Sequence, residues 1–409
     1  MTPDAPNHLL HMARCGIHGP ICQAGPPCRG HQSCASGTLV FRGTLCPFPD
    51  HRRTWQLGWC ISCSSFPEPQ HMSLNFPFTA IVGQDEMKQA LVMSAIDPSI
   101  GGVLIFGSRG TGKSTAVRAL AALLPPITAI KNCPVNSSEA SQVPSWADLK
   151  SKRKTKIPTP VVDLPLGVTE DRVTGALDIE KALTKGEKAF QPGLLAKANR
   201  GFLYIDEINL LEDHIVDLLL DVAQSGENLV EREGLSVRHA ARFVLIGSGN
   251  PEEGELRPQL LDRFGLAVDV GNPKDVAQRI EVIRRRDAFD QNPEAFLEQW
   301  QNEETKLRDA ITKAQKSRHD LKVPDETLED IATLCAALGS DGLRGELTLL
   351  RAARAYAAWH GAKSAIRREH VMAVAPMALQ HRLRRDPLDE TSGVLRVHRV
   401  MEQVFGPAI

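Results

Sequence analysis

The fold is decided by one stretch of eight residues, Gly107-Ser108-Arg109-Gly110-Thr111-Gly112-Lys113-Ser114. It fits the pattern G-x-x-x-x-G-K-[ST], in which the glycines let backbone N–H groups turn toward phosphate groups. Lys113 would bring a positive charge to the β- and γ-phosphates, and the Ser114 hydroxyl would bind Mg2+. We therefore predict that this phosphate-binding loop (P-loop), together with Thr115, binds Mg-ATP; the alternative is a glycine-rich turn with a chance lysine.

The sequence around the P-loop alternates apolar strands with amphipathic helices. Residues 103–106 predict a buried strand before the loop, and a helix is expected to begin near Thr115. Two more strands are predicted at residues 202–205 and 243–246, and the residues between them show helical spacing: Leu211, Ile215, Leu218, Leu219 and Val222. This alternation predicts an α/β fold with a parallel sheet that helices cover on both faces.

Polar side chains follow two of the predicted strands. Asp206 and Glu207 come directly after the second strand, where Asp206 would hold Mg2+ through water and Glu207 would orient and polarise the attacking water. The alternative for this pair is a helix cap. Asn250 follows the third strand and would bond to the γ-phosphate or the attacking water; the alternative is a turn asparagine before Pro251.

Composition shifts predict the domain organisation. Residues 132–174 break the alternating pattern with prolines and a basic run, and we interpret them as an insertion in a core domain of residues 72–272. A smaller all-α domain is expected over residues 273–409, because apolar residues there recur only at helical spacing, in three groups: Val276, Ile280 and Ile283; Phe296, Trp300, Leu307 and Ile311; and Leu328, Ile331, Leu334 and Leu338, closed by Gly339.

The bulk composition excludes some classes of protein. The formal net charge is −1, which argues against a protein that coats DNA, and no apolar run is long enough to predict a membrane span. Residues 1–71 differ from the rest, since they hold seven of the nine cysteines and no lysine. They allow a zinc site on Cys60-x-x-Cys63 or a transit peptide, but we favour translation from Met72 and a disordered, dispensable extension before it.

The order of these features resembles the AAA+ ATPases: a strand, a P-loop, an Asp-Glu strand, an Asn strand and a helical region. Within that class the chain is similar to the I subunit of magnesium chelatase. The similarity covers about residues 76 to 390, and longer matching runs carry it: residues 78–84, 162–172, 186–193, 213–217, 260–265 and 383–389.

This resemblance implies a ring-forming, hexameric motor with an AAA+ core and a C-terminal α-helical lid. With a D subunit and a porphyrin-binding H subunit, its ATP hydrolysis would drive Mg2+ into protoporphyrin IX in chlorophyll or bacteriochlorophyll synthesis. The resemblance assigns Asn250 to sensor 1, Arg263 to the arginine finger that reaches a neighbour's ATP, and Arg344 to sensor 2. It implies the cytoplasm of a phototrophic bacterium, or the plastid stroma if a transit peptide were present.

Two rival functions remain at this point. A MoxR-type AAA+ chaperone would share the segment at residues 167–172 but would lack the tail at residues 383–389, which is present. A DNA-translocating AAA+ ATPase is disfavoured because the chain has neither a helix-turn-helix nor a paired zinc-ribbon signature and is nearly neutral. We therefore expect no nucleic acid among its partners.

Overall fold

The computed structural model describes residues 74–406 except 148, 150, 233, 251, 253, 255, 341 and 384–391, and except the side chains of 258 and 259. Several predictions from the sequence lie outside the described residues. These are the extension with its Cys60-x-x-Cys63 pair, the start at Met72 and most of the tail at residues 383–389.

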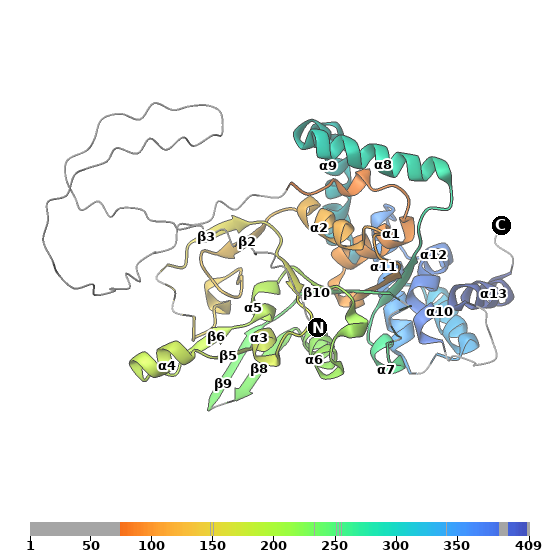
Figure 1. Cartoon of the computed structure of the whole chain (residues 1–409). Helices are drawn as coiled ribbons and strands as arrows, with labels where there is room; N and C mark the ends of the chain where they lie inside the picture. Colours follow the sequence, from red (N-terminus) through yellow and green to blue (C-terminus); the bar gives the residue numbers. More distant parts are fainter. Residues whose placement is uncertain are drawn as a thin grey trace, which may run out of the picture. The chain divides into compact units, whose positions relative to one another are not determined.

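The centre of the fold is a parallel sheet of five strands in the order β11-β1-β10-β7-β4 (Figure 1). This finding confirms the predicted α/β class and all three predicted strands, although β10 starts one residue late and runs further. The sheet also has two strands that the sequence analysis missed, β4 and β11. The bounds are β1 Val103–Gly107, β4 Val161–Leu164, β7 Phe202–Ile205, β10 Val244–Gly249 and β11 Leu266–Val270.

The position of β4 corrects the predicted extent of the insertion. Val161 pairs with Phe202 of β7, so residues 161–164 belong to the main sheet although the sequence analysis placed them in the insertion. Prolines at 158, 160 and 165 flank this short strand and masked it in the sequence. Before it, an antiparallel pair lies outside the main sheet, β2 Ile127–Ile130 with β3 Lys154–Ile157.

Helices cover both faces of the sheet, as the alternation predicted. Alternate residues of a strand point to opposite faces; thus Ile105 of β1 joins the hydrophobic cluster under α1 Asp85–Ile96 and α2 Lys113–Leu123. Leu104 instead joins the cluster under α6 Asp213–Ser225. The sheet is therefore buried on both sides, as parallel sheets are.

Shorter elements lie outside the main sheet, among them two antiparallel hairpins, β5–β6 and β8–β9. The bounds are α3 Glu170–Thr174, β5 Gly175–Leu177, α4 Ile179–Lys185, β6 Phe190–Pro192, α5 Leu194–Ala198, β8 Glu227–Arg232, β9 Leu235–Ala240 and α7 Pro258–Leu261.

No strand follows β11 among the described residues, only helices, turns and one isolated bridge between Lys322 and Ala365, and the three predicted helices are confirmed. Gly339 takes a φ of +68° where α10 ends, a conformation that favours glycine. The bounds are α8 Val276–Gln291, α9 Pro293–Ser317, α10 Asp325–Leu338, α11 Arg344–Trp359, α12 Arg368–Leu379 and α13 Gly393–Phe405.

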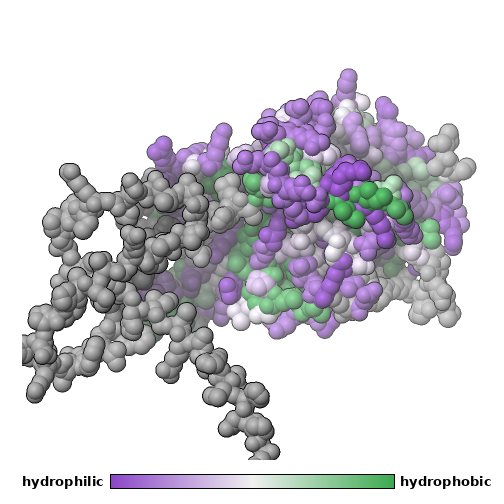
Figure 2. Space-filling view, turned by 45° about the horizontal axis from the view of Figure 1, so that its top comes forward, coloured by the Kyte–Doolittle hydropathy of each residue, from purple (hydrophilic) through white to green (hydrophobic). Residues whose placement is uncertain are grey.

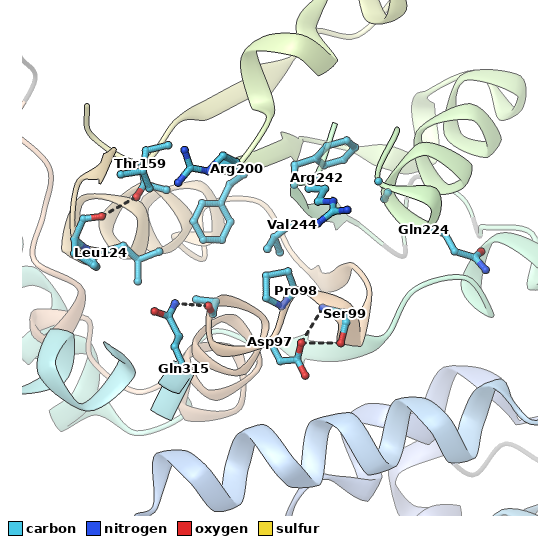
Figure 3. A pocket seen from close by; sticks show the side chains of 18 of the residues that line it. Asp97, Pro98, Ser99, Leu124, Thr159, Arg200, Gln224, Arg242, Val244 and Gln315 are labelled. Atoms are coloured by element: carbon cyan, nitrogen blue, oxygen red, sulfur yellow. Dashed lines mark hydrogen bonds between the residues drawn. The ribbon is translucent and has the colours of Figure 1, made fainter. Parts of the chain in front are cut away.

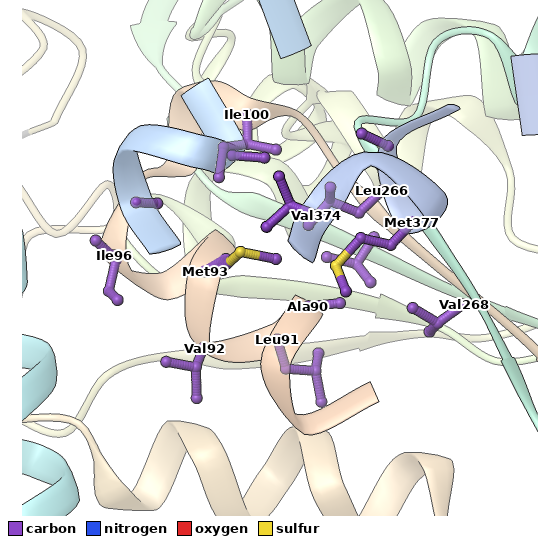
Figure 4. Close-up of a cluster of buried hydrophobic side chains, with 14 of the residues drawn as sticks. Ala90, Leu91, Val92, Met93, Ile96, Ile100, Leu266, Val268, Val374 and Met377 are labelled. Atoms are coloured by element: carbon purple, nitrogen blue, oxygen red, sulfur yellow. The ribbon is translucent and has the colours of Figure 1, made fainter. Parts of the chain in front are cut away.

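The C-terminal helices share a hydrophobic core with the sheet. Figure 4 shows Val374 and Met377 of α12 packed with Met93 of α1 and with Leu266 of β11. All four side chains are almost completely buried. The predicted boundary near residue 272 therefore separates two kinds of secondary structure, but apolar packing continues across it.

Candidate nucleotide site

A cavity of about 480 Å³ opens at the carboxyl edge of the sheet, and most of the predicted site residues line it. The P-loop runs from β1 to α2. A Cβ atom on Gly107 would lie 2.2 Å from the Val270 carbonyl oxygen, so only glycine fits there. Gly112 precedes α2 with a φ of +81°. The lining is Arg109, Gly110, Thr111, Gly112, Lys113, Ser114, Thr115, Tyr204, Asp206, Glu207 and Asn250.

The P-loop offers several donors to an anion. The N-terminal turn of α2, which begins at Lys113, presents N–H groups without helical partners and the positive end of the helix dipole. Lys113 Nζ donates to the Gly107 carbonyl at 2.5 Å, which holds the ammonium over the loop. The Gln84 side chain donates to the Thr111 carbonyl and ties the loop to the start of α1.

Asp206 is held at the end of β7 by two hydroxyl groups. Ser248 Oγ donates to Asp206 Oδ1 at 2.6 Å, and the Tyr204 hydroxyl lies 3.0 Å from the same oxygen. Burial raises the pKa of Tyr204 well above its ordinary value, so the hydroxyl stays protonated. These bonds fix one carboxylate oxygen of an exposed side chain that lines the cavity, which suits a magnesium ligand.

Glu207 has an unusual backbone conformation beside the P-loop. Its φ is +54°, which costs energy for a residue with a side chain and is often found where function requires a fixed position. Its Oε1 atom lies 2.9 Å from Arg109 Nη2, and its N–H donates to Ser248 Oγ at 3.3 Å. Asn250 is largely buried nearby, and its Oδ1 accepts from the Glu252 N–H at 3.3 Å.

Two predicted residues, Arg263 and Arg344, line a different cavity, of about 430 Å³ at the amino edge of the sheet. Arg263 pairs with Asp221 at 2.7 Å, and Arg344 pairs with Asp262 at 2.9 Å. The two cavities share no lining residue among the described part of the chain. Ten of the predicted residues thus line the P-loop cavity, whereas these two arginines lie at the opposite edge of the sheet.

Arg382 anchors the loop that carries Arg263. Its side chain is almost fully buried, pairs with Asp262 and donates to the Phe264 carbonyl at 2.7 Å. Burial lowers the pKa of its guanidinium, which the Asp262 charge opposes. Two arginines, Arg344 and Arg382, therefore hold Asp262, the residue before Arg263.

The sequence analysis missed Gln84, Tyr204 and Ser248, which hold the loop and Asp206 in place. Tyr204 lies inside the predicted strand at residues 202–205, two residues before Asp206, whereas Ser248 lies two residues beyond the predicted strand at residues 243–246, inside β10 as the structure has it. The signal in the sequence that could have identified them is a hydroxyl side chain near the carboxyl end of an otherwise apolar strand.

A third and larger cavity, of about 630 Å³, lies at the amino edge beyond the end of α1 (Figure 3). Asp97 accepts there from the Ser99 hydroxyl at 2.7 Å, and Gln315 of α9 donates to the Ala95 carbonyl at 2.8 Å. Arg200 and Arg242 also line this cavity. None of the predicted site residues is among the described residues that line it.

Comparison with known families gives two matches. The family model described as "Magnesium chelatase, subunit ChlI" matches residues 77–259, and the one described as "AAA lid domain" matches residues 328–402. No helix in the described part of the chain is long and apolar enough to cross a membrane.

Two curated relatives match over most or all of their length. The magnesium-chelatase 38 kDa subunit of Cereibacter sphaeroides is 68% identical over 334 residues, which are 82% of this chain and 100% of that protein. The magnesium-chelatase subunit ChlI of a Nostoc species is 52% identical and covers 81% of this chain and 90% of its own length.

Two solved structures are also similar. A chain described as part of the complex between subunits BchI and BchD of magnesium chelatase is 65% identical, with a TM-score of 0.49; the match covers 77% of this chain and 98% of that one. A putative ATPase from Cytophaga hutchinsonii is 17% identical, with a TM-score of 0.55, over 80% of this chain and 91% of that one. The second likeness concerns the fold alone.

Proposed function

This chain belongs to the magnesium chelatase I-subunit family of AAA+ ATPases, and from that premise we propose that its P-loop cavity binds and hydrolyses Mg-ATP to drive Mg2+ into protoporphyrin IX. The observation that carries the proposal is the single cavity that gathers Lys113, Ser114, Asp206, Glu207 and Asn250. Hydrogen-bond donors for phosphate, oxygen ligands for Mg2+ and a carboxylate that can orient water lie together there. These are the groups that phosphoryl transfer needs.

The residues fit Mg-ATP on chemical grounds. The P-loop amides and Lys113 suit phosphate oxygens, and we assign the Ser114 hydroxyl and the Asp206 carboxylate to Mg2+, which prefers oxygen ligands. The bonds from Ser248 and Tyr204 orient Asp206 for that role. In this proposal Glu207 polarises the attacking water, and Asn250 bonds to that water or to the γ-phosphate.

We further propose that Arg263 and Arg344 complete the site of a neighbouring copy. They line one cavity at the amino edge, while the P-loop cavity opens at the carboxyl edge of the same sheet. A head-to-tail ring would bring the arginine cavity of one copy to the P-loop cavity of the next. There the guanidinium groups would stabilise the charge that develops on the transferred phosphoryl group.

The proposal includes partners and a place of action. A homo-oligomeric ring, hexameric as in the AAA+ class, would act with a magnesium chelatase D subunit and a porphyrin-binding H subunit. In support, a solved relative 65% identical to this chain is described as a complex with a D subunit. We place the chain in the cytoplasm of a phototrophic bacterium, with the plastid stroma as the alternative, since one relative is described as chloroplastic.

A reconstituted assay tests this function. The chain is mixed with D and H subunits, Mg-ATP and protoporphyrin IX, and Mg-protoporphyrin is followed by its fluorescence. We expect product with the native chain and with Lys306→Ala, an exposed lysine on α9, but none with Lys113→Ala. The MoxR-type chaperone and DNA-translocating alternatives have no support from the family matches; ATPase activity that DNA stimulates, without chelation, would contradict the proposal.

A further inference from the structure

Two of the exposed apolar patches on the described surface lie on α8 and at the start of α11. The first, which we call the α8 stripe, consists of Val276, Ile280 and Ile283, with exposed fractions of 68%, 50% and 68%. The second, the α11 patch, consists of Leu343 and Leu347, exposed by 74% and 51%. Residues spaced by three or four positions lie on one side of a helix, so each set forms a continuous surface.

The α8 stripe lies beside the P-loop edge of the sheet. Val270, at the end of β11, pairs with Gly107 at the start of the P-loop, and α8 begins six residues later. The opposite side of α8 faces its own chain, since Arg285 donates to the Ala80 carbonyl at 2.9 Å and Phe289 is buried. The stripe therefore points outward. Figure 2, which brings α8 and α9 forward from Figure 1, shows hydrophobic side chains exposed among hydrophilic ones.

The α11 patch belongs to the opposite edge. Leu343 and Leu347 line the arginine cavity together with Arg263, Arg344 and Arg351. That cavity also includes Gly102, which directly precedes β1, so it opens where the strands begin. Each patch thus lies next to one half of the proposed shared ATP site.

We propose that Leu343 and Leu347 of one copy pack against the α8 stripe of the next copy in the ring. The proposal deepens the shared site and rests on it: if Arg263 and Arg344 approach a neighbour's P-loop, the α11 patch reaches the neighbour's surface beside that loop. The contact joins unlike patches at opposite edges of one chain, which is the heterologous interface that closes into a ring. Burial of both patches supplies the apolar driving force for assembly.

Two variants that introduce opposite charges on the two patches test this contact. Ile280→Lys would place an ammonium against the neighbour's Arg344 and Arg351, while Leu347→Glu would bury a carboxylate against the apolar stripe. We expect each variant to weaken ring assembly in Mg-ATP at least tenfold, measured by sedimentation velocity over a range of protein concentrations. The double variant would restore assembly, because each interface then holds one Lys–Glu pair.

The matched control is Val282→Lys on the same helix. Val282 is 41% exposed but lies on the other side of α8, about 160° around the axis from Ile280. We expect this variant to assemble like the native chain. Normal assembly of Ile280→Lys would overturn the proposal, and so would a folded double variant that stays unassembled. Loss of D-subunit binding with normal homo-oligomers would assign the stripe to that partner instead and would also overturn it.

Binding of a fluorescent ATP analogue to the dilute, unassembled chain separates this inference from the proposed function. All of these variants retain the P-loop and should bind the analogue with native affinity. A native chain that fails to bind it would contradict the proposed function. Native binding and native ring formation by Ile280→Lys would contradict only the inferred contact.

Discussion

Arg109 Nη2 lies 2.9 Å from Glu207 Oε1, so an ion pair joins the P-loop to the carboxylate that we assign to water activation. The Glu207 side chain is mostly buried, and its backbone is fixed at a φ of +54°. The Arg109 side chain is largely exposed and reaches the carboxylate from the rim of the cavity. The position of Glu207 therefore depends on a residue that sequence patterns treat as a variable position in the P-loop.

Removal of this ion pair should slow hydrolysis without weakening ATP binding. For Arg109→Ala we expect about a tenfold loss of kcat, within the range for a misplaced catalytic group, and little change in nucleotide affinity. Arg109→Lys, which keeps the positive charge, should retain more activity. Phosphate release and titration with a fluorescent ATP analogue measure the two effects. An affinity loss as large as that of Lys113→Ala would place Arg109 on the nucleotide instead.

Lys113→Ala and Glu207→Gln should differ in kind. The first removes the charge that neutralises phosphate and should weaken ATP binding. The second keeps the shape of the site but removes the carboxylate charge, so ATP should bind while hydrolysis falls by about 10² to 10⁴. Equilibrium binding and single-turnover kinetics separate the two effects. Equal losses of ATP affinity in both variants would contradict the separate roles.

Arg263→Ala should bind ATP yet hydrolyse it about 10³ to 10⁵ times more slowly, the usual effect of losing an arginine finger. Mixing it with Lys113→Ala should restore part of the activity, because an intact P-loop from one chain then meets an intact Arg263 from the other. Arg238→Ala on β9, which removes an exposed arginine elsewhere, is the control. Mixed rings that stay inactive at every ratio would show that Arg263 does not act between chains.

Ser248→Ala should raise the Mg2+ concentration needed for half-maximal hydrolysis by about tenfold. The hydroxyl donates to Asp206 Oδ1 at 2.6 Å, and loss of such a bond to a metal-binding carboxylate typically costs about 10- to 100-fold in metal affinity. Excess Mg2+ should restore most of kcat. Ser225→Ala, a serine at the end of α6, serves as the control. An unchanged Mg2+ dependence would show that Ser248 does not position Asp206.

His381 should make the chain less stable in mild acid. Burial, followed by the Arg382 charge, lowers the pKa of His381 to about 3 from an ordinary 6.5, and its Nε2 bonds to the Phe264 carbonyl. The unfolded chain takes up a proton below pH 6.5 while the folded chain does not, so stability falls between pH 6.5 and 3. This residue alone should cost about 2 to 3 kcal/mol at pH 4.5 relative to pH 7.

His381→Gln is the comparison, because its amide N–H can replace the bond to Phe264 and it does not titrate. Urea unfolding at pH 7 and pH 4.5 should show a smaller pH-dependent loss in this variant than in the native chain. The carboxylates contribute equally to both proteins, so the difference reports on residue 381. Identical pH dependence would contradict the assigned pKa.

Strong local patterns predicted the central part of the fold. Residues 103–106 and 202–205 are uniformly apolar because both faces of the sheet are buried, and such runs stand out. Residues 161–164 belong to an edge strand with Asp163 exposed, flanked by prolines, and β11 also carries an acid, Asp269. Neither strand has a continuous apolar run, so only long-range pairing with β7 and β1 identifies them.

The residues of the candidate site likewise fall into those that the sequence could predict and those that it could not. Lys113, Asp206 and Asn250 could be predicted because each follows a strand at a fixed spacing, and parallel strands end at one edge. The contacts of Ser248 with Asp206 and Tyr204, and of Gln84 with Thr111, join residues that are 27 to 44 positions apart, which a linear pattern does not show. The placement of Arg263 and Arg344 in a separate cavity likewise depends on how α11 packs against the sheet.

The apolar packing that continues from the sheet through α1 into α12 has a mechanical consequence. A lid joined to its core only by a flexible linker can swing over the nucleotide and leave the rest of the subunit still. Here such a swing would expose Met93, Val374 and Met377 to water. The core and the C-terminal helices of one subunit should therefore move as one rigid body, with the hinges at the interfaces between copies. The free energy of ATP hydrolysis would then be transmitted across those interfaces.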